Sequence, residues 1–66
     1  MTDAPETSEY RIVRANAAAT QYLLEALIAE GAPSVAIKEA AYRADRAAAR
    51  WIAMQIDRAM AERRAS

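Results

Sequence analysis

Arginine and tyrosine are the residue types of this sequence that are best suited to bind a ligand. A guanidinium group holds phosphate or carboxylate oxygens through paired hydrogen bonds, and an aromatic ring stacks on a planar base. The chain has no histidine and no cysteine, which excludes His or Cys nucleophile–base pairs and thiolate or imidazole metal sites. Its acidic residues are dispersed, so no carboxylate pair for acid–base catalysis is expected. The sequence therefore predicts a non-enzymatic binding protein without a metal or cofactor.

Two groups of these side chains are candidates for a ligand site. An antiparallel hairpin that turns near residue 32 places residue 22 level with residue 42, and the start of its first helix beside the second half of its second helix. The candidate ligand-binding residues are Tyr10, Arg11, Arg14, Arg50, Arg58, Tyr22 and Tyr42. For Tyr22 and Tyr42 the alternative is a place at the rim of an interface, which an amphipathic tyrosine tolerates. For the other residues the alternative is a solvated helix end, in which Trp51 anchors the core.

A third candidate is an anion-binding face formed by Arg43, Arg46 and Arg50, which project within about 60° of one another on a helix. Residues 1–32 carry five acidic and two basic residues, whereas residues 33–66 carry seven basic and four acidic ones. Pairing of an acidic first helix with a basic second helix is the competing interpretation. The net charge of zero, together with Glu39 and Asp57 on the arginine face, argues against duplex DNA as the ligand.

Two alanine-rich segments separated by Gly31-Ala32-Pro33-Ser34 must position these side chains. Nineteen alanines favour helix, Gly31 is a typical helix stop, and Ser34 is expected to cap the second helix. The prediction is all-α: a flexible polar leader over 1–7 and one hairpin domain over 8–66, with a helix over about 8–30, a turn over 31–34 and a helix over about 35–64. No apolar run is long enough to span a membrane or follows a basic leader, so a soluble cytoplasmic protein is expected.

Apolar residues recur at every third or fourth position in both segments. In the first segment the seam consists of Tyr10, Val13, Ala17, Thr20, Leu24 and Leu27, widened by Ile12, Ala19 and Leu23. In the second segment the arc consists of Ala36, Ile37, Ala40, Ala41, Ala44, Ala47, Ala48, Trp51, Ile52 and Met54. Each arc covers about half of the helix circumference, more than the ~100° stripe that one partner helix requires.

This excess apolar surface predicts a homo-oligomer, either a dimer that forms a four-helix bundle or a larger closed ring. Asn16 lies inside the first arc, where a buried asparagine typically sets the register or the oligomeric state; a polar contact to a ligand is the alternative. The candidate oligomer-interface residues are Asn16, Leu24, Leu27, Ala40, Ala44, Ala48, Trp51 and Ile52.

The stretch from Glu25-Ala26-Leu27 through Pro33 and Val35, followed by Ala44-Asp45-Arg46-Ala47-Ala48-Ala49-Arg50-Trp51 and Ile56, resembles a family of small phage proteins. Those proteins are helical hairpins that sequester the cyclic nucleotide signals of the bacterial CBASS and Thoeris immune systems. The resemblance covers about residues 12–60. It implies a multimer in the host cytoplasm that holds a signal nucleotide between protomers without cleaving it, and it assigns no individual binding residue.

Two functional hypotheses follow. The first is an oligomeric anti-defence protein that sequesters a cyclic nucleotide, which the arginine and tyrosine residues outside the apolar arcs favour. The second is a protein-interaction module, such as an adaptor, an inhibitor or a structural subunit. Its broad alanine-lined apolar face would dock a helix of another protein.

Overall fold

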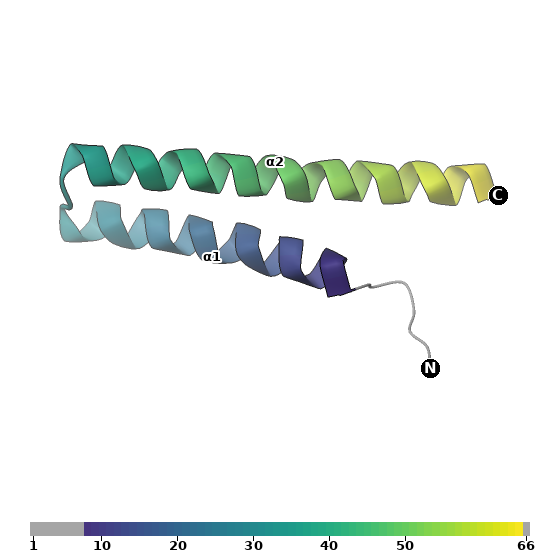
Figure 1. Cartoon of the computed structure of the whole chain (residues 1–66), viewed down its shortest axis with the longest axis horizontal. Coiled ribbons are helices and arrows are strands. Elements are labelled where there is room, and N and C mark those ends of the chain that lie inside the picture. Colours follow the sequence, from purple (N-terminus) through teal and green to yellow (C-terminus); the bar gives the residue numbers. More distant parts are fainter. Residues whose placement is uncertain (1–7, 66) are drawn as a thin grey trace.

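The chain folds into an antiparallel hairpin of two α-helices (Figure 1). The computed structural model describes residues 8–65, so the expected leader over residues 1–7 lies outside the described part. Helix α1 comprises Ser8–Glu30 and helix α2 comprises Ser34–Ala65. The all-α class and the hairpin that the sequence predicts are confirmed. Helix α2 is the longer and extends well past the first residue of α1 (Figure 1).

The turn ends α1 with a two-hydrogen-bond C-terminal cap. The Gly31 N–H donates to the Ile28 carbonyl at 3.1 Å, and the Ala32 N–H donates to the Leu27 carbonyl at 3.0 Å. This is the Schellman arrangement, in which the residue after the helix takes a left-handed conformation. Gly31 has that conformation, with φ at 72°, as its glycine identity predicts.

Replacement of Gly31 by alanine is expected to lower the free energy of unfolding by about 1 kcal/mol, because left-handed backbone strains a residue that has a Cβ. A Cβ built at Gly31 meets no atom within 4 Å, so the cost comes from the backbone conformation and not from a clash. Gly31→Asn is the matched control, since asparagine tolerates this conformation better. Urea denaturation checks the order, and an alanine variant as stable as the asparagine variant would contradict it.

Helix α2 begins one residue earlier than the sequence suggests. The Pro33 carbonyl accepts hydrogen bonds from the N–H groups of Ala36 and Ile37, at 3.0 and 3.1 Å. Pro33 therefore holds the capping position, and Ser34 is the first helical residue instead of the expected cap. A proline suits this place because it has no N–H that the start of the helix would leave unpaired.

One seam of side chains from each helix holds the hairpin together. The six α1 seam residues predicted at three- and four-residue spacing are buried or half-buried in the structure, and Val13 is the most buried of them. Ile12, Ala19 and Leu23, which were expected to widen the seam, are instead exposed, because α2 covers only a narrow stripe of α1. The matching α2 residues, again spaced by three and four, are Ile37, Ala40, Ala44, Ala47, Trp51, Met54 and Arg58. Such spacing keeps one stripe of each helix turned toward the other. Thr20 fits in the seam because its hydroxyl group donates to the Asn16 and Ala17 carbonyls of its own helix.

Ile52 is the exception to the predicted α2 arc. It is 52% exposed, since Trp51 occupies the seam and the next residue along a helix points about 100° away. Ile52 therefore belongs to the outer surface of the hairpin and not to its seam.

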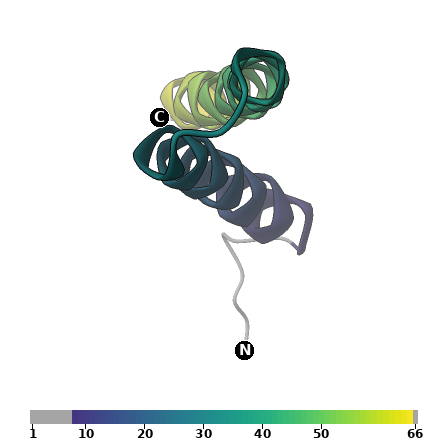
Figure 2. The same cartoon turned by 90° about the vertical axis from the view of Figure 1, so that its left-hand side faces the viewer.

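The width of the seam follows the size of its side chains. The helix axes cross, and they diverge from the turn toward the N-terminal end of α1 (Figures 1 and 2). Alanines Ala40, Ala44 and Ala47 line the closer part and are at most 8% exposed. Tyr10 and Trp51 fill the wider part near the open end, with ring centroids 5.0 Å apart.

The core that results is thin. Val13 and three alanines are the buried residues of the described chain, and no side chain in that part is fully enclosed. Nine large apolar side chains of the described residues are instead 48–75% exposed. The hairpin thus leaves more large apolar groups in solvent than it buries.

Candidate functional site

The open end of the hairpin gathers aromatic rings and arginines, as the register of the helices predicts. The Tyr10 and Trp51 rings lie at 51° to each other, and the Arg58 guanidinium carbon lies 4.5 Å from the centroid of the Tyr10 ring. The Arg14 guanidinium carbon lies 6.0 Å from the same centroid. Tyr10, Trp51 and Arg58 are half-buried, so these residues pack against one another and close the seam.

We expect Arg58→Gln to cost about 0.5–1 kcal/mol of unfolding free energy, because it removes the cation above the Tyr10 ring. Arg58→Lys keeps a cation and should recover part of this loss. Arg58 also lies 4.0 Å from Glu62, but the glutamate is largely exposed and such a pair adds little. Thermal unfolding of both variants checks the order, and equal losses for lysine and glutamine would contradict a cation–π contribution.

Arg50 is brought to the same end but to a different partner. Its guanidinium group lies 3.3 Å from the Glu9 carboxylate, which joins the two helices across the open end. Two further ion pairs lie within α2 and join Arg43 to Glu39 and Arg58 to Glu62. Pairing of an acidic with a basic helix, one of the two interpretations of the charge pattern, therefore has a direct instance at Glu9 and Arg50. Arg11 is exposed on α1.

Tyr22 and Tyr42 do not form a common surface. They are 74% and 62% exposed, and each projects from the side of its helix opposite to the seam. The hairpin register gives them the same height but places them on opposite outer sides. Tyr42 is partnered within α2, where Arg46 donates to its hydroxyl group at 3.2 Å and lies over its ring at 5.6 Å.

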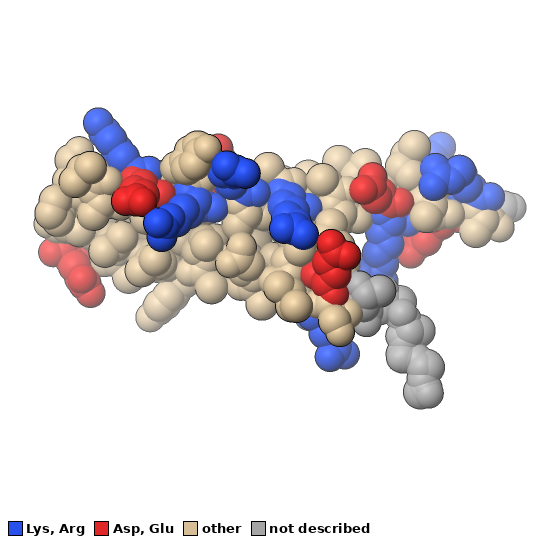
Figure 3. Space-filling view, in the orientation of Figure 1, with Lys and Arg blue, Asp and Glu red and all other residues tan. Residues whose placement is uncertain are grey.

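A groove between the helices carries the three arginines of the predicted anion-binding face. Its volume is about 680 Å³. It is lined by Asn16, Thr20, Glu39, Tyr42, Arg43, Arg46, Ala47 and Arg50. Smaller hollows that share Arg50 at one end and Arg43 at the other continue the groove along the same flank. Figure 3 shows basic side chains gathered on the middle of α2, with acidic side chains beside them.

The charge in this groove is unevenly neutralised. Arg43 hydrogen-bonds to Glu39 at 3.0 Å, and Arg50 hydrogen-bonds to Glu9 at 3.3 Å. Arg46 contacts the Tyr42 phenol instead of a carboxylate. Tyr42 therefore orients the Arg46 guanidinium group without neutralising its charge, which suits the binding of an anion.

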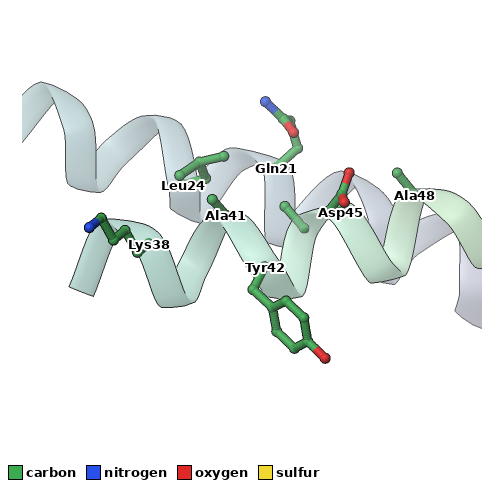
Figure 4. A pocket seen from close by; sticks show the side chains of 8 residues that line it. Gln21, Leu24, Lys38, Ala41, Tyr42, Asp45 and Ala48 are labelled. Atoms are coloured by element: carbon green, nitrogen blue, oxygen red, sulfur yellow. The ribbon is translucent and has the colours of Figure 1, made fainter. Parts of the chain in front are cut away.

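The opposite flank has a shallower hollow of about 480 Å³ (Figure 4). Leu24 and Ala41 lie at the junction of the helices, while Lys38 and Asp45 stand at its rim. Tyr42 points away from α1 in this view. The hollow contains one basic and one acidic residue and has no concentration of charge comparable to the arginine groove.

The candidate oligomer-interface residues divide into two sets. Six belong to the seam or its edge within one hairpin: Leu24, Leu27, Ala40, Ala44, Ala48 and Trp51. Of these, Ala40 and Ala44 are buried against α1, so a second copy cannot reach them while the hairpin is closed. Asn16 and Ile52 are exposed and remain accessible.

The sequence does not by itself reveal the contacts of Glu9 and Arg46. The hairpin register is the signal for Glu9, since it places the start of α1 near Arg50. The spacing of Tyr42 and Arg46 by four residues is the signal for their contact along one helix face.

Comparison with family models, with curated proteins and with solved structures finds no match to this chain. Neither described helix is long and apolar enough to cross a membrane. Within residues 8–65, no three acidic side chains lie close enough together to hold a metal ion. The arginine groove and the exposed apolar faces are the candidate functional surfaces of the hairpin.

Proposed function

We propose that this protein is a non-catalytic binding protein that works as an assembly of helical hairpins. The observation that carries the proposal is the imbalance, within residues 8–65, between nine exposed large apolar side chains and a core of one valine and three alanines. Exposed apolar faces of this kind mark association surfaces. Small domains with little core commonly reach stability by oligomerisation.

The arginine groove is the ligand site in this proposal, and an anion that carries phosphate is its ligand. Arg46 supplies an oriented guanidinium group on Tyr42, and Asn16 and Thr20 line the opposite wall of the groove. A cyclic nucleotide, the ligand class that the family resemblance implies, combines phosphates for guanidinium groups with bases for stacking. Sequestration of such a signal in the cytoplasm needs no acid–base group, in keeping with a chain that lacks histidine and cysteine.

The ion pairs that now occupy the groove are weak competitors. The side chains of Arg43 and Glu39 are 66% and 64% exposed, and those of Arg50 and Glu9 are 65% and 68% exposed. Ion pairs with this degree of exposure contribute at most about 1 kcal/mol. A phosphate group that accepts hydrogen bonds from two arginines at once can displace their carboxylate partners.

A thermal-shift experiment against cyclic di- and trinucleotides, with the mass measured in the same buffer, tests the ligand. At 100 times its dissociation constant a ligand stabilises the protein by about 2.7 kcal/mol, which raises the melting temperature of a small domain by several degrees. Arg46→Ala should remove this shift, whereas Arg63→Ala, an exposed arginine in the last turn of α2, should retain it. No shift with any nucleotide would rule out these ligands, and equal shifts in both variants would rule out the groove.

The second candidate function is a module that docks a helix of another protein. The observation that favours it is a row of apolar side chains on the outer surface of the C-terminal half of α2. Ile52, Ile56 and Met60 are 48–56% exposed and follow one another at helical spacing. In this case Ile56→Arg should abolish capture of the partner. Ala61→Arg, at an exposed alanine that projects about 140° away from Ile56 on the same helix, should retain it.

A further inference from the structure

A second apolar stripe runs along the outer side of α1, beside the seam but separate from it. Its members are Ile12, Ala15, Asn16, Ala19, Tyr22, Leu23 and Ala26. All of them are exposed except Ala26, which is half-buried. From Ile12 to Ala26 the stripe is about 21 Å long at 1.5 Å per residue. Helix α2 packs against the neighbouring face of α1, which carries Val13, Ala17 and Thr20, and leaves the stripe uncovered. Ile12, Asn16 and Leu23, on the edge of the stripe nearest α2, also line the arginine groove and the hollows that continue it.

From this stripe we infer a homodimer in which α1 packs antiparallel against α1 of a second copy, with the two-fold axis at Ala19. This inference rests on the proposed function and identifies the partner of the exposed α1 face. In an isologous interface the same surface of each copy must be complementary to itself. When two copies of α1 run antiparallel, all members of the stripe overlap if Ala19, its midpoint, lies on the two-fold axis.

The side-chain sizes along the stripe are self-complementary in this register. Ile12 lies level with Ala26 of the second copy, and Leu23 lies level with Ala15 of the second copy. Ile12 and Leu23 therefore each lie level with an alanine, and Ala19 lies opposite its own equivalent at the closest point. Small residues at the crossing let two helices approach closely, as the buried alanines do within the hairpin.

The polar groups of the stripe stay at its margins in this arrangement. Asn16 and Tyr22 project about 120° apart, on opposite edges of the stripe, where water can hydrogen-bond to both. Glu30 of the second copy reaches the start of the first copy's α1. There the Arg50 guanidinium group, already 3.3 Å from Glu9, supplies a positive charge between the two carboxylates. The zero net charge of the chain adds no repulsion between copies.

Paired substitutions at neighbouring alanines test this face. Ala19→Arg places two guanidinium groups face to face at the two-fold axis and should weaken association at least about 100-fold. Ala18→Arg is the matched control: it adds the same charge to an exposed alanine one residue away, on the polar side of α1. It should change the dissociation constant by less than about threefold, since its side chain stays in solvent.

Disulfide cross-linking tests the register, and the absence of native cysteines makes it clean. Oxidised Ala19→Cys should form a covalent dimer, and Ala18→Cys should not. Ala26→Cys should also remain uncrosslinked, because antiparallel pairing holds its two copies about 21 Å apart. A cross-link at both Ala19→Cys and Ala26→Cys would show parallel helices and overturn the inference.

The outcomes separate this inference from the proposed function. If the wild-type protein is a monomer, the assembly proposed above falls together with the interface. If the wild type is an oligomer but Ala19→Arg and Ala18→Arg associate equally well, assembly stands and the α1 stripe is not the interface. If Ala19→Arg does not fold, the cysteine variants still test the inference, because their cross-linking is measured on folded protein.

Discussion

Replacement of Trp51 by alanine is expected to lower the free energy of unfolding by about 2–3 kcal/mol. Trp51 is half-buried at the open end, where its ring packs 5.0 Å from the ring of Tyr10. Arg58 also contacts the Tyr10 ring, but truncation of Trp51 removes the aromatic side chain of the α2 seam and leaves a void where the helices diverge. In a hairpin with so small a core, a loss of this size is a large share of the total stability.

The neighbouring residue provides the control for Trp51. Ile52→Ala also removes a large apolar side chain from α2, but Ile52 is 52% exposed and should cost less than about 1 kcal/mol. Far-UV circular dichroism in urea is the suitable measurement, because Trp51 is the single tryptophan and its fluorescence is lost in the variant. Equal losses at the two positions would show that Trp51 does not anchor the seam.

Ala44→Leu is expected to destabilise the hairpin by about 1–3 kcal/mol, although leucine is more hydrophobic than alanine and nearly as good a helix former. Ala44 is 4% exposed and lies where the helices pack closely. A leucine there must push α1 and α2 apart and open contacts along the whole alanine-lined part of the seam. The same substitution at Ala49, which is exposed on α2, should change stability by no more than about 0.5 kcal/mol.

Thermal or urea unfolding of the two leucine variants decides between close packing and loose packing. Close packing predicts a lower midpoint for Ala44→Leu alone. A midpoint for Ala44→Leu above that of the wild type would mean that the seam has space to fill, and that the alanines do not set the distance between the helices.

The hairpin and its α1 seam could be predicted from the sequence because they depend on local signals. Gly31 marks the end of α1, and the spacing of apolar residues by three and four marks the face that packs. The grouping of Tyr10 with Trp51 and Arg58 follows from counting residues away from the turn. Each of these inferences needs only a helix geometry and a turn position.

What could not be predicted depends on how each helix is rotated about its axis. Counting from the turn gives Tyr22 and Tyr42 the same height but does not say that they face opposite ways. It also cannot separate Trp51 from Ile52, since a broad arc includes both until packing selects one. The ion pair of Arg50 with Glu9 and the contact of Arg46 with Tyr42 depend on side-chain conformations that a helical projection does not contain.

The proposed function requires that the working unit is an assembly and not the single hairpin, whose large apolar side chains are mostly exposed. The most direct test is sedimentation equilibrium of the wild-type protein over a wide concentration range. An even multiple of the 7.2 kDa chain mass is expected, with dissociation on dilution accompanied by loss of helical signal. A stable, fully helical 7.2 kDa monomer at all concentrations would contradict it.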